Sequence, residues 1–432
     1  MNTTRSNGAG PSDAARRVRA ILAGSSGNLV EWYDFYVYSA FSLYFAKSFF
    51  PEGDQTAQLL GTAGIFAAGF LMRPIGAWFF GRLADRRGRR LALTSSVLLM
   101  CFGSALIAVT PVYATIGIGA PMLLLVARLI QGLSLGGEYG TSATYLSEMA
   151  TPERRGFYSS FQYVTLIGGQ LAAMLVLLVL QKFLLSSAQL EAWGWRIPFV
   201  IGAMLAIAVF RLRRDMHETS AFTQSQHRDG SLRALLKFQR QVAIVFGLTL
   251  GGSIAFYTFT TYMQKFLVNT SGIPKDTVTV ISAAALFLFM LMQPIAGAIS
   301  DKIGRRPVMI FFGLTGTLLT VPIMTALQGT RDPLTAFVLV MCALTFLTGY
   351  TAVNAIVKAE LFPVQVRALG VGFPYAMTQA IFGGSAEYAA LWLKQAGAEP
   401  YFFWYVTGAI FISLLVYSLM PETRNTSAIE AH

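Results

Sequence analysis

Charged residues are scarce in this chain of 432 residues. Asp, Glu, Lys and Arg make up 12% of it, against about 25% in a typical soluble domain, and 54% of the residues are apolar. Cysteine and histidine are scarcer still, with two and three copies. The sequence has no Cys/His cluster and no GxxxxGK loop, the usual signatures of a metal site and of a phosphate-binding loop. We therefore expect a membrane protein that needs neither metal nor cofactor.

Apolar runs of about 20 residues recur along the whole chain, and each is long enough to cross a hydrocarbon core of about 30 Å. The mean hydropathy of +0.55 agrees with this pattern. We predict an all-α membrane protein with twelve transmembrane helices. The predicted spans are 19–47, 58–81, 91–111, 121–149, 157–182, 194–213, 240–266, 276–300, 307–328, 334–360, 368–394 and 400–420.

Two charged patterns occur twice, about half a chain apart. Asp85-Arg-Arg-Gly-Arg-Arg90 is matched by Asp301-Lys-Ile-Gly-Arg-Arg306, and the pair Glu148/Arg155 is matched by Glu360/Arg367. Repeats at a fixed offset indicate related structural units. We predict two pseudo-symmetric six-helix bundles, 1–213 and 240–432 with a short tail, joined by a polar cytoplasmic linker at 214–239.

The distribution of lysine and arginine predicts the orientation. If the N-terminus is cytoplasmic, about 24 of the 33 basic residues fall in cytoplasmic segments, as the positive-inside rule requires. Both termini are then cytoplasmic. The net charge of +12 is explained by contact with anionic lipids, so we expect no nucleic-acid partner.

Several motifs carry a resemblance to a known family. The loop at 81–90 resembles the signature loop of the major facilitator superfamily, and Asn28–Tyr38 resembles its metabolite:H⁺ symporter branch. Further stretches that resemble this branch lie at 70–76, 131–145, 161–170 and 256–265. The resemblance implies the major facilitator fold, with a substrate site near the midplane between the halves. It also implies symport of a proton with a small dicarboxylate by alternating access, with α-ketoglutarate as the first choice.

Positive charge inside the membrane predicts where the substrate binds. A charge at the bilayer centre costs about 2.5–3.5 kcal/mol on insertion scales, so it should face the bundle interior. We expect Arg73 and Arg128 to be the only embedded cations. Each could bind a substrate carboxylate, because the guanidinium group of an arginine is a planar fork that matches a carboxylate. Lys265 lies nearer the outer end of its span. The predicted substrate-binding residues are Arg73, Arg128, Gln162, Gln170, Tyr257 and Lys265.

Proton coupling needs a carboxyl group that exchanges its proton near neutral pH, which desolvation and a nearby cation can arrange. Glu31 and Asp34 share a helical face, and Glu138 shares a stripe with Arg128. The family resemblance implicates Arg128 in coupling. We predict that Glu31, Asp34, Glu138 and Arg128 couple the proton to the substrate, with Asp34 or Glu138 as the group that releases and rebinds it. Structural ion pairs are the alternative for these residues.

The repeated charged patterns predict a gate on the cytoplasmic side. An acid near the start of a helix is favoured by the helix dipole, and the arginines can pair with acids of the other half. We expect this cluster to hold the cytoplasmic side closed while the protein faces outward. A plain topology signal is the alternative. The predicted gate residues are Asp85, Arg89, Asp301, Arg305, Glu148, Arg155, Glu360 and Arg367.

Other functions remain open from the sequence alone. A same-family symporter could carry citrate, shikimate or a zwitterion such as proline or betaine, although two embedded arginines favour an anion. An anion channel is a different class, and gradient-driven accumulation would separate it from a carrier. An enzyme is not expected, because no Ser/His/Asp constellation is visible. We expect a monomer in the bacterial inner membrane, with the dicarboxylate, the proton and the lipid bilayer as partners.

Overall fold

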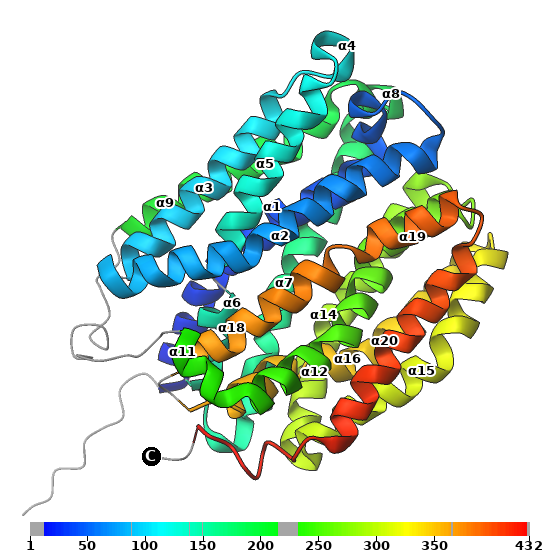
Figure 1. Cartoon of the computed structure of the whole chain (residues 1–432). Helices are drawn as coiled ribbons and strands as arrows, with labels where there is room; N and C mark the ends of the chain where they lie inside the picture. Colours follow the sequence, from blue (N-terminus) through cyan, green and yellow to red (C-terminus); the bar gives the residue numbers. More distant parts are fainter. Residues whose placement is uncertain are drawn as a thin grey trace, which may run out of the picture.

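The computed structural model describes residues 13–87, 89–137, 139–148, 150–214, 232–363 and 366–429, and every element in these ranges is helical. Long helices run side by side, with the first half of the chain on one side of the molecule and the second half on the other (Figure 1). The short helices α4 (Tyr113–Ile116) and α8 (Ser187–Ala192) lie at one end, which we call the far end. The opposite end carries the turn between α14 and α15 and is called the motif end.

Six spans come from the first half of the chain, and two of them consist of consecutive segments. They are α1 (Asp13–Phe49), α2 (Gln55–Arg87), α3 (Arg89–Val109), α5 (Gly119–Leu135) with α6 (Tyr139–Glu148), α7 (Arg155–Val179) with the π-helical η2 (Leu180–Leu184), and α9 (Ile197–Arg214).

Six further spans come from the second half, after the short helix α11 (Leu232–Leu235) and the turn η4 (Leu236–Phe238). The predicted all-α fold with twelve spans is confirmed. The domain boundaries remain a prediction, since 215–231 of the linker lie outside the described residues. The spans are α12 (Gln239–Phe256) with η5 (Tyr257–Tyr262) and α13 (Met263–Asn269), α14 (Lys275–Ile303), α15 (Arg305–Gly329), α16 (Pro333–Thr351) with α17 (Asn354–Glu360), α18 (Arg367–Thr378) with η6 (Gln379–Gly383) and α19 (Ala386–Gln395), and α20 (Glu399–Leu419).

Three of these spans change their helical geometry inside the membrane. η5 and η6 are π-helical, and residues 352–353 separate α16 from α17. π-turns are frequent at functional sites, and irregular backbone at membrane depth is tolerated where protein buries it or where it lines a cavity. Each irregular segment packs against the first half: η5 on α1, η6 on α2, and α17 on α6. The irregular backbone therefore marks the boundary between the halves.

Glycines allow α2 and α5 to approach very closely. A Cβ on Gly132 would lie 1.8 Å from the carbonyl oxygen of Gly69, and a Cβ on Gly136 would lie 2.1 Å from that of Arg73. No other residue type fits these positions without moving the helices apart. The close approach brings the backbones that carry Arg73 and Arg128 into direct contact.

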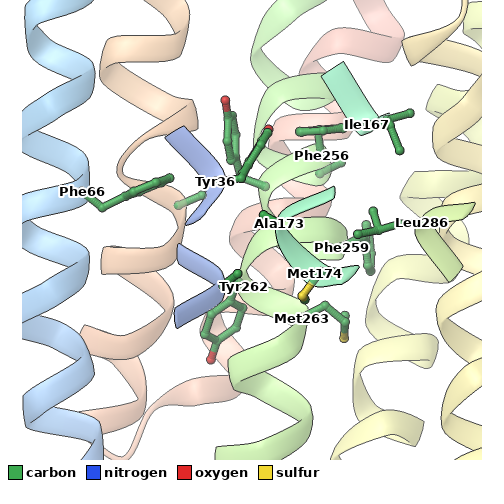
Figure 2. Close-up of a cluster of buried hydrophobic side chains, with 14 of the residues drawn as sticks. Tyr36, Phe66, Ile167, Ala173, Met174, Phe256, Phe259, Tyr262, Met263 and Leu286 are labelled. Carbon is green, nitrogen blue, oxygen red and sulfur yellow. The ribbon is translucent and has the colours of Figure 1, made fainter. Parts of the chain in front are cut away.

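Aromatic and sulfur-containing side chains fill the boundary between the halves. Figure 2 shows Tyr36 of α1 and Met174 of α7 gathered with Phe256, Tyr262 and Met263 of the span that begins the second half. All five side chains are at most 3% exposed. The boundary is therefore packed like a protein core, so the two halves form one continuous hydrophobic cluster in this state.

The turn between α14 and α15 illustrates why the repeated motif contains glycine. Gly304 adopts φ +100°, a conformation that side chains with a Cβ rarely adopt. Its counterpart in the first copy, Gly88, lies outside the described residues.

Candidate functional site

Arg73 of α2 lies in a socket of aromatic rings. Its guanidinium carbon is 3.9 Å from the ring centre of Phe70, 4.7 Å from that of Phe35 and 5.1 Å from that of Trp32. The side chain is 3% exposed, and in the described part of the chain its Nε and Nη2 atoms have no hydrogen-bond partner. The rings stabilise the cation, but unpaired donors are costly. An anionic ligand would satisfy them.

Arg128 of α5 also lies against aromatic rings, one of which it shares with Arg73; we call these rings the aromatic wall. Its guanidinium carbon is 4.3 Å from the ring centre of Phe35 and 4.5 Å from that of Tyr38. Phe35 therefore contacts both cations. Nη1 of Arg128 donates to Oε1 of Gln131 at 2.7 Å, while Nε and Nη2 have no partner within the described ranges. One nitrogen of Arg128 is thus bound by Gln131, and the other two are available to a ligand.

A chain of hydrogen bonds connects Arg128 to a buried acid. Gln131 donates from Nε2 to Oγ of Ser104 at 2.7 Å, and the Ser104 hydroxyl donates to Oδ2 of Asp34. Asp34 is fully buried, its Oδ1 has no described partner, and no described cation lies within 4.0 Å of it. Gly202 of α9 leaves room for that oxygen, because a Cβ there would lie 2.1 Å from it. The arrangement links the buried carboxyl group of Asp34 indirectly to the guanidinium group of Arg128.

The second half contributes Tyr257, the first residue of the π-helical η5. Its ring packs edge-on against Phe70 at 5.2 Å between centres, beside the ring on which Arg73 rests. The predicted residues Gln162 and Gln170 of α7 are both buried. Neither amide atom of Gln162 has a described hydrogen-bond partner, and the same holds for Oε1 of Gln170. These polar groups are therefore available to a ligand between the halves.

The far end is closed by contacts between the halves around a buried ion pair that belongs to the second half. Nζ of Lys265 in α13 is 3.1 Å from Oε2 of Glu387 in α19, and it also donates to the hydroxyl of Ser39 in α1. The adjacent Gln264 donates to the carbonyl of Ala40 at 3.2 Å. Lys265 was predicted to bind substrate, but in this state its charge is engaged by Glu387.

The motif end is closed by Asp301, at the end of α14. Its carboxylate accepts the backbone N–H groups of Gly156 at 2.8 Å and Phe157 at 2.9 Å, at the start of α7 in the other half. Arg305 pairs with Asp301 at 2.8 Å and with Glu360 at 3.5 Å. A carboxylate at a helix N-terminus satisfies unpaired donors and interacts favourably with the dipole. We call this cluster the Asp301 latch.

The remaining predicted gate residues have mixed outcomes. Arg367 is buried beside the chain tail and donates to the carbonyl of Phe362 at 3.0 Å and to that of Ala428 at 3.1 Å. Arg155, the first residue of α7, is also buried. The side chains of Asp85, Arg89 and Glu148 lie outside the described residues.

Among the proton-coupling candidates, Glu31 is buried one turn before Asp34 on α1, and Glu138 lies outside the described residues.

One expectation is wrong: Arg73 and Arg128 are not the only embedded cations. Lys265 and Lys358 are both fully buried within their spans. Lys358 lies two residues before the end of α17 and inside the predicted span 334–360, but the expectation left it out. Its burial between helices follows from contacts that hydropathy does not report. In the described part of the chain, no group of three or more His, Cys, Asp or Glu residues could hold a metal ion.

Twelve helices in two groups, with buried cations at their boundary and closures at both ends, define a transporter of the major facilitator type. Residues 20–243 and 230–432 match the family model described as Sugar (and other) transporter, and the chain belongs to this family. The fold is that of the D-xylose-proton symporter, whose crystal structure gives a TM-score of 0.77 at 20% identity and covers 95% of this chain and 99% of that one.

Two bacterial relatives are similar in sequence. The chain is 59% identical to the alpha-ketoglutarate permease of Escherichia coli (strain K12) over 414 residues, which is 96% of this chain and 95% of the relative. It is 37% identical to the citrate-proton symporter of Salmonella typhi over 375 residues, with 84% and 85% covered. The chain is therefore a multi-pass inner-membrane transporter and not an enzyme.

Proposed function

We propose that this protein imports α-ketoglutarate, or a closely similar dicarboxylate, together with a proton. The observation that carries the proposal is the pair of buried arginines on one aromatic wall, each with two unpartnered donor atoms within the described structure. An arginine fork binds a carboxylate through two parallel hydrogen bonds. The names of the two bacterial relatives, one for α-ketoglutarate and one for citrate with a proton, support a di- or tricarboxylate cargo.

In this proposal Arg73 binds a substrate carboxylate directly, and Tyr257, Gln162 and Gln170 supply neutral hydrogen bonds from around it. Arg128 interacts with the negative charge of the substrate, and the hydrogen bonds through Gln131 and Ser104 connect this interaction to Asp34. A bound anion beside Arg128 weakens the field that keeps Asp34 ionised, which favours uptake of a proton there. Loading with substrate and loading with a proton are therefore mutually reinforcing.

The two closures would alternate. We take the motif end as cytoplasmic, because lysine and arginine are concentrated there, and the far end as periplasmic; both termini are then cytoplasmic. Breaking the Asp301 latch would open the site toward the cytoplasm, and breaking the contacts of Lys265 and Gln264 with α1 would open it toward the periplasm. Rocking of two six-helix units about the midplane site would open one closure at a time.

Counterflow in proteoliposomes tests this proposal. Purified protein is reconstituted with unlabelled α-ketoglutarate inside, and uptake of radiolabelled α-ketoglutarate is competed by citrate, succinate, shikimate or proline. We expect saturable uptake that α-ketoglutarate competes best and proline does not compete. In a second experiment, net uptake into proteoliposomes without internal substrate must respond to an imposed pH gradient and to an uncoupler. Uptake that ignores both would refute symport, and best competition by proline would refute an anionic cargo.

A further inference from the structure

Lys358 of α17 is a fully buried cation on the motif side of the boundary between the halves. Its Nζ donates to Oδ1 of Asn354 at 2.9 Å and, at 3.4 Å, to the hydroxyl of Tyr139. It also lies over aromatic rings, 4.1 Å from the centre of Tyr375 and 5.3 Å from that of Tyr139. The ammonium group is thus held by neutral oxygens and ring faces.

No carboxylate in the described ranges lies within 4.0 Å of Lys358, in contrast to the other buried lysine. Lys265 is equally buried, but Glu387 is 3.1 Å from its ammonium group. Burying a charge without an oppositely charged partner is costly, and ring faces compensate only in part. An anion that arrives during transport would supply the partner that the protein does not.

The neighbours of Lys358 come from both halves of the chain. Tyr139 belongs to α6 of the first half and stacks on Tyr375 of α18, with ring centres 3.6 Å apart and planes 10° from parallel. Tyr139 also donates to Oδ1 of Asn354 at 3.1 Å. Opening of the motif end would separate Tyr139 from the other three residues and expose the ammonium group to the opening path.

Lys358 also lies close to the Asp301 latch. Glu360, which pairs with Arg305, is two residues further along the same short helix. The amide of Asn354 donates to the carbonyls of Tyr350 and Thr351, where α16 ends, and this fixes its Oδ1 toward Lys358. The cation is therefore preorganised and does not swing freely.

We infer that Lys358, held in place by Asn354, forms a second anion-binding station on the cytoplasmic side, which binds a carboxylate of the substrate in the inward-open state. This inference rests on the proposed function, since it assumes a carboxylate cargo. The station would give the dianion a favourable position on its way out of the Arg73 site.

Exchange of radiolabelled α-ketoglutarate, varied outside the vesicles against saturating unlabelled α-ketoglutarate inside, tests the station from each side separately. Right-side-out membrane vesicles report the KM on the periplasmic side, and inverted vesicles report it on the cytoplasmic side. Lys358→Met should raise the cytoplasmic KM about tenfold, the factor that corresponds to ~1.4 kcal/mol, while the periplasmic KM changes less than about threefold. Lys302→Met removes an exposed charge from the same face and serves as the matched control, with no change on either side.

Thermal stability separates a ligand site from a structural role. Removal of an unpaired buried charge should leave the Tm of the purified protein in detergent unchanged or higher, whereas loss of a structural contact would lower it. Lys358→Gln keeps a hydrogen-bonding group and should reproduce the asymmetric KM change if the methionine variant does not fold. Equal KM changes on both sides, no change at all, or a lowered Tm with a symmetric loss would overturn the inference. Absence of exchange by the unmodified protein would instead refute the proposed function.

Discussion

Replacement of Asp34 by asparagine should uncouple transport from the proton gradient while leaving the carrier folded. Asparagine is nearly isosteric, and its Oδ1 can still accept the hydrogen bond from Ser104. The bond changes from charge-assisted to neutral, which costs about 1 kcal/mol in local stability. The proton-exchanging group is lost entirely, so the effect on coupling should far exceed the effect on folding.

The size of the effect follows from the driving force. One pH unit is worth ~1.4 kcal/mol for each proton, which corresponds to a tenfold substrate gradient. If one proton accompanies each substrate, the unmodified protein should accumulate substrate about tenfold for each unit of pH difference. Asp34→Asn should give no accumulation above the external concentration. Its counterflow rate should stay within about threefold of the unmodified rate, since exchange needs no net proton movement.

The assay uses proteoliposomes with the membrane potential clamped at zero by potassium and valinomycin, so that only the pH gradient drives uptake. Asp276→Asn is the matched control, because it removes a half-exposed carboxylate near the far end, where Asp276 pairs with Lys182 at 2.7 Å. It should accumulate substrate normally. Accumulation by Asp34→Asn at the unmodified level would refute the role of Asp34 and leave Glu31 and Glu138 as candidates.

Three further predictions follow from the same geometry. Arg73→Lys keeps the charge but loses the fork, and it should raise the counterflow KM about tenfold or more; an unchanged KM would contradict direct binding. Asp301→Asn should favour the inward-open state by about 1–3 kcal/mol. The measurement is thiol labelling of Ala143→Cys in a background without native cysteines, which should be faster in the Asp301→Asn variant than in the protein that keeps Asp301. Equal labelling rates would contradict the latch. Gly132→Ala should reduce the yield of folded transporter, whereas Gly408→Ala, with open space at its Cβ, should not.

The fold could be predicted from the sequence because hydropathy is a local property. Each span can be recognised from its own apolar run. The repeated motifs show that the two halves are related, and this inference needs no information on packing. The close approach of α5 to α2 could likewise be predicted, since small residues at helical spacing allow it: Gly132 in α5 and Gly136 directly after it lie against the backbone of α2. These features depend on residues near one another in the chain.

The details of the site could not be predicted in the same way. Ser104 is one of many serines, and only the three-dimensional arrangement reveals that it joins Asp34 to Gln131. Lys358 lies two residues from the end of the predicted span 334–360, where hydropathy does not distinguish a lysine buried between helices from one at the membrane surface. Which side chains of different spans meet depends on the rotation and tilt of each helix, and neither is fixed by periodicity alone.

The Asp301 latch has a consequence for the speed of the carrier. The latch must break in every cycle, so each additional ~1.4 kcal/mol in its strength reduces the unloaded inward-open population tenfold. A stronger latch would slow turnover, and a weaker one would let empty carriers and stray protons cross. Natural variation in the residues around Gly156 and Asp301 should therefore change both the maximal transport rate and the proton leak, in the same direction, without any change in the substrate site.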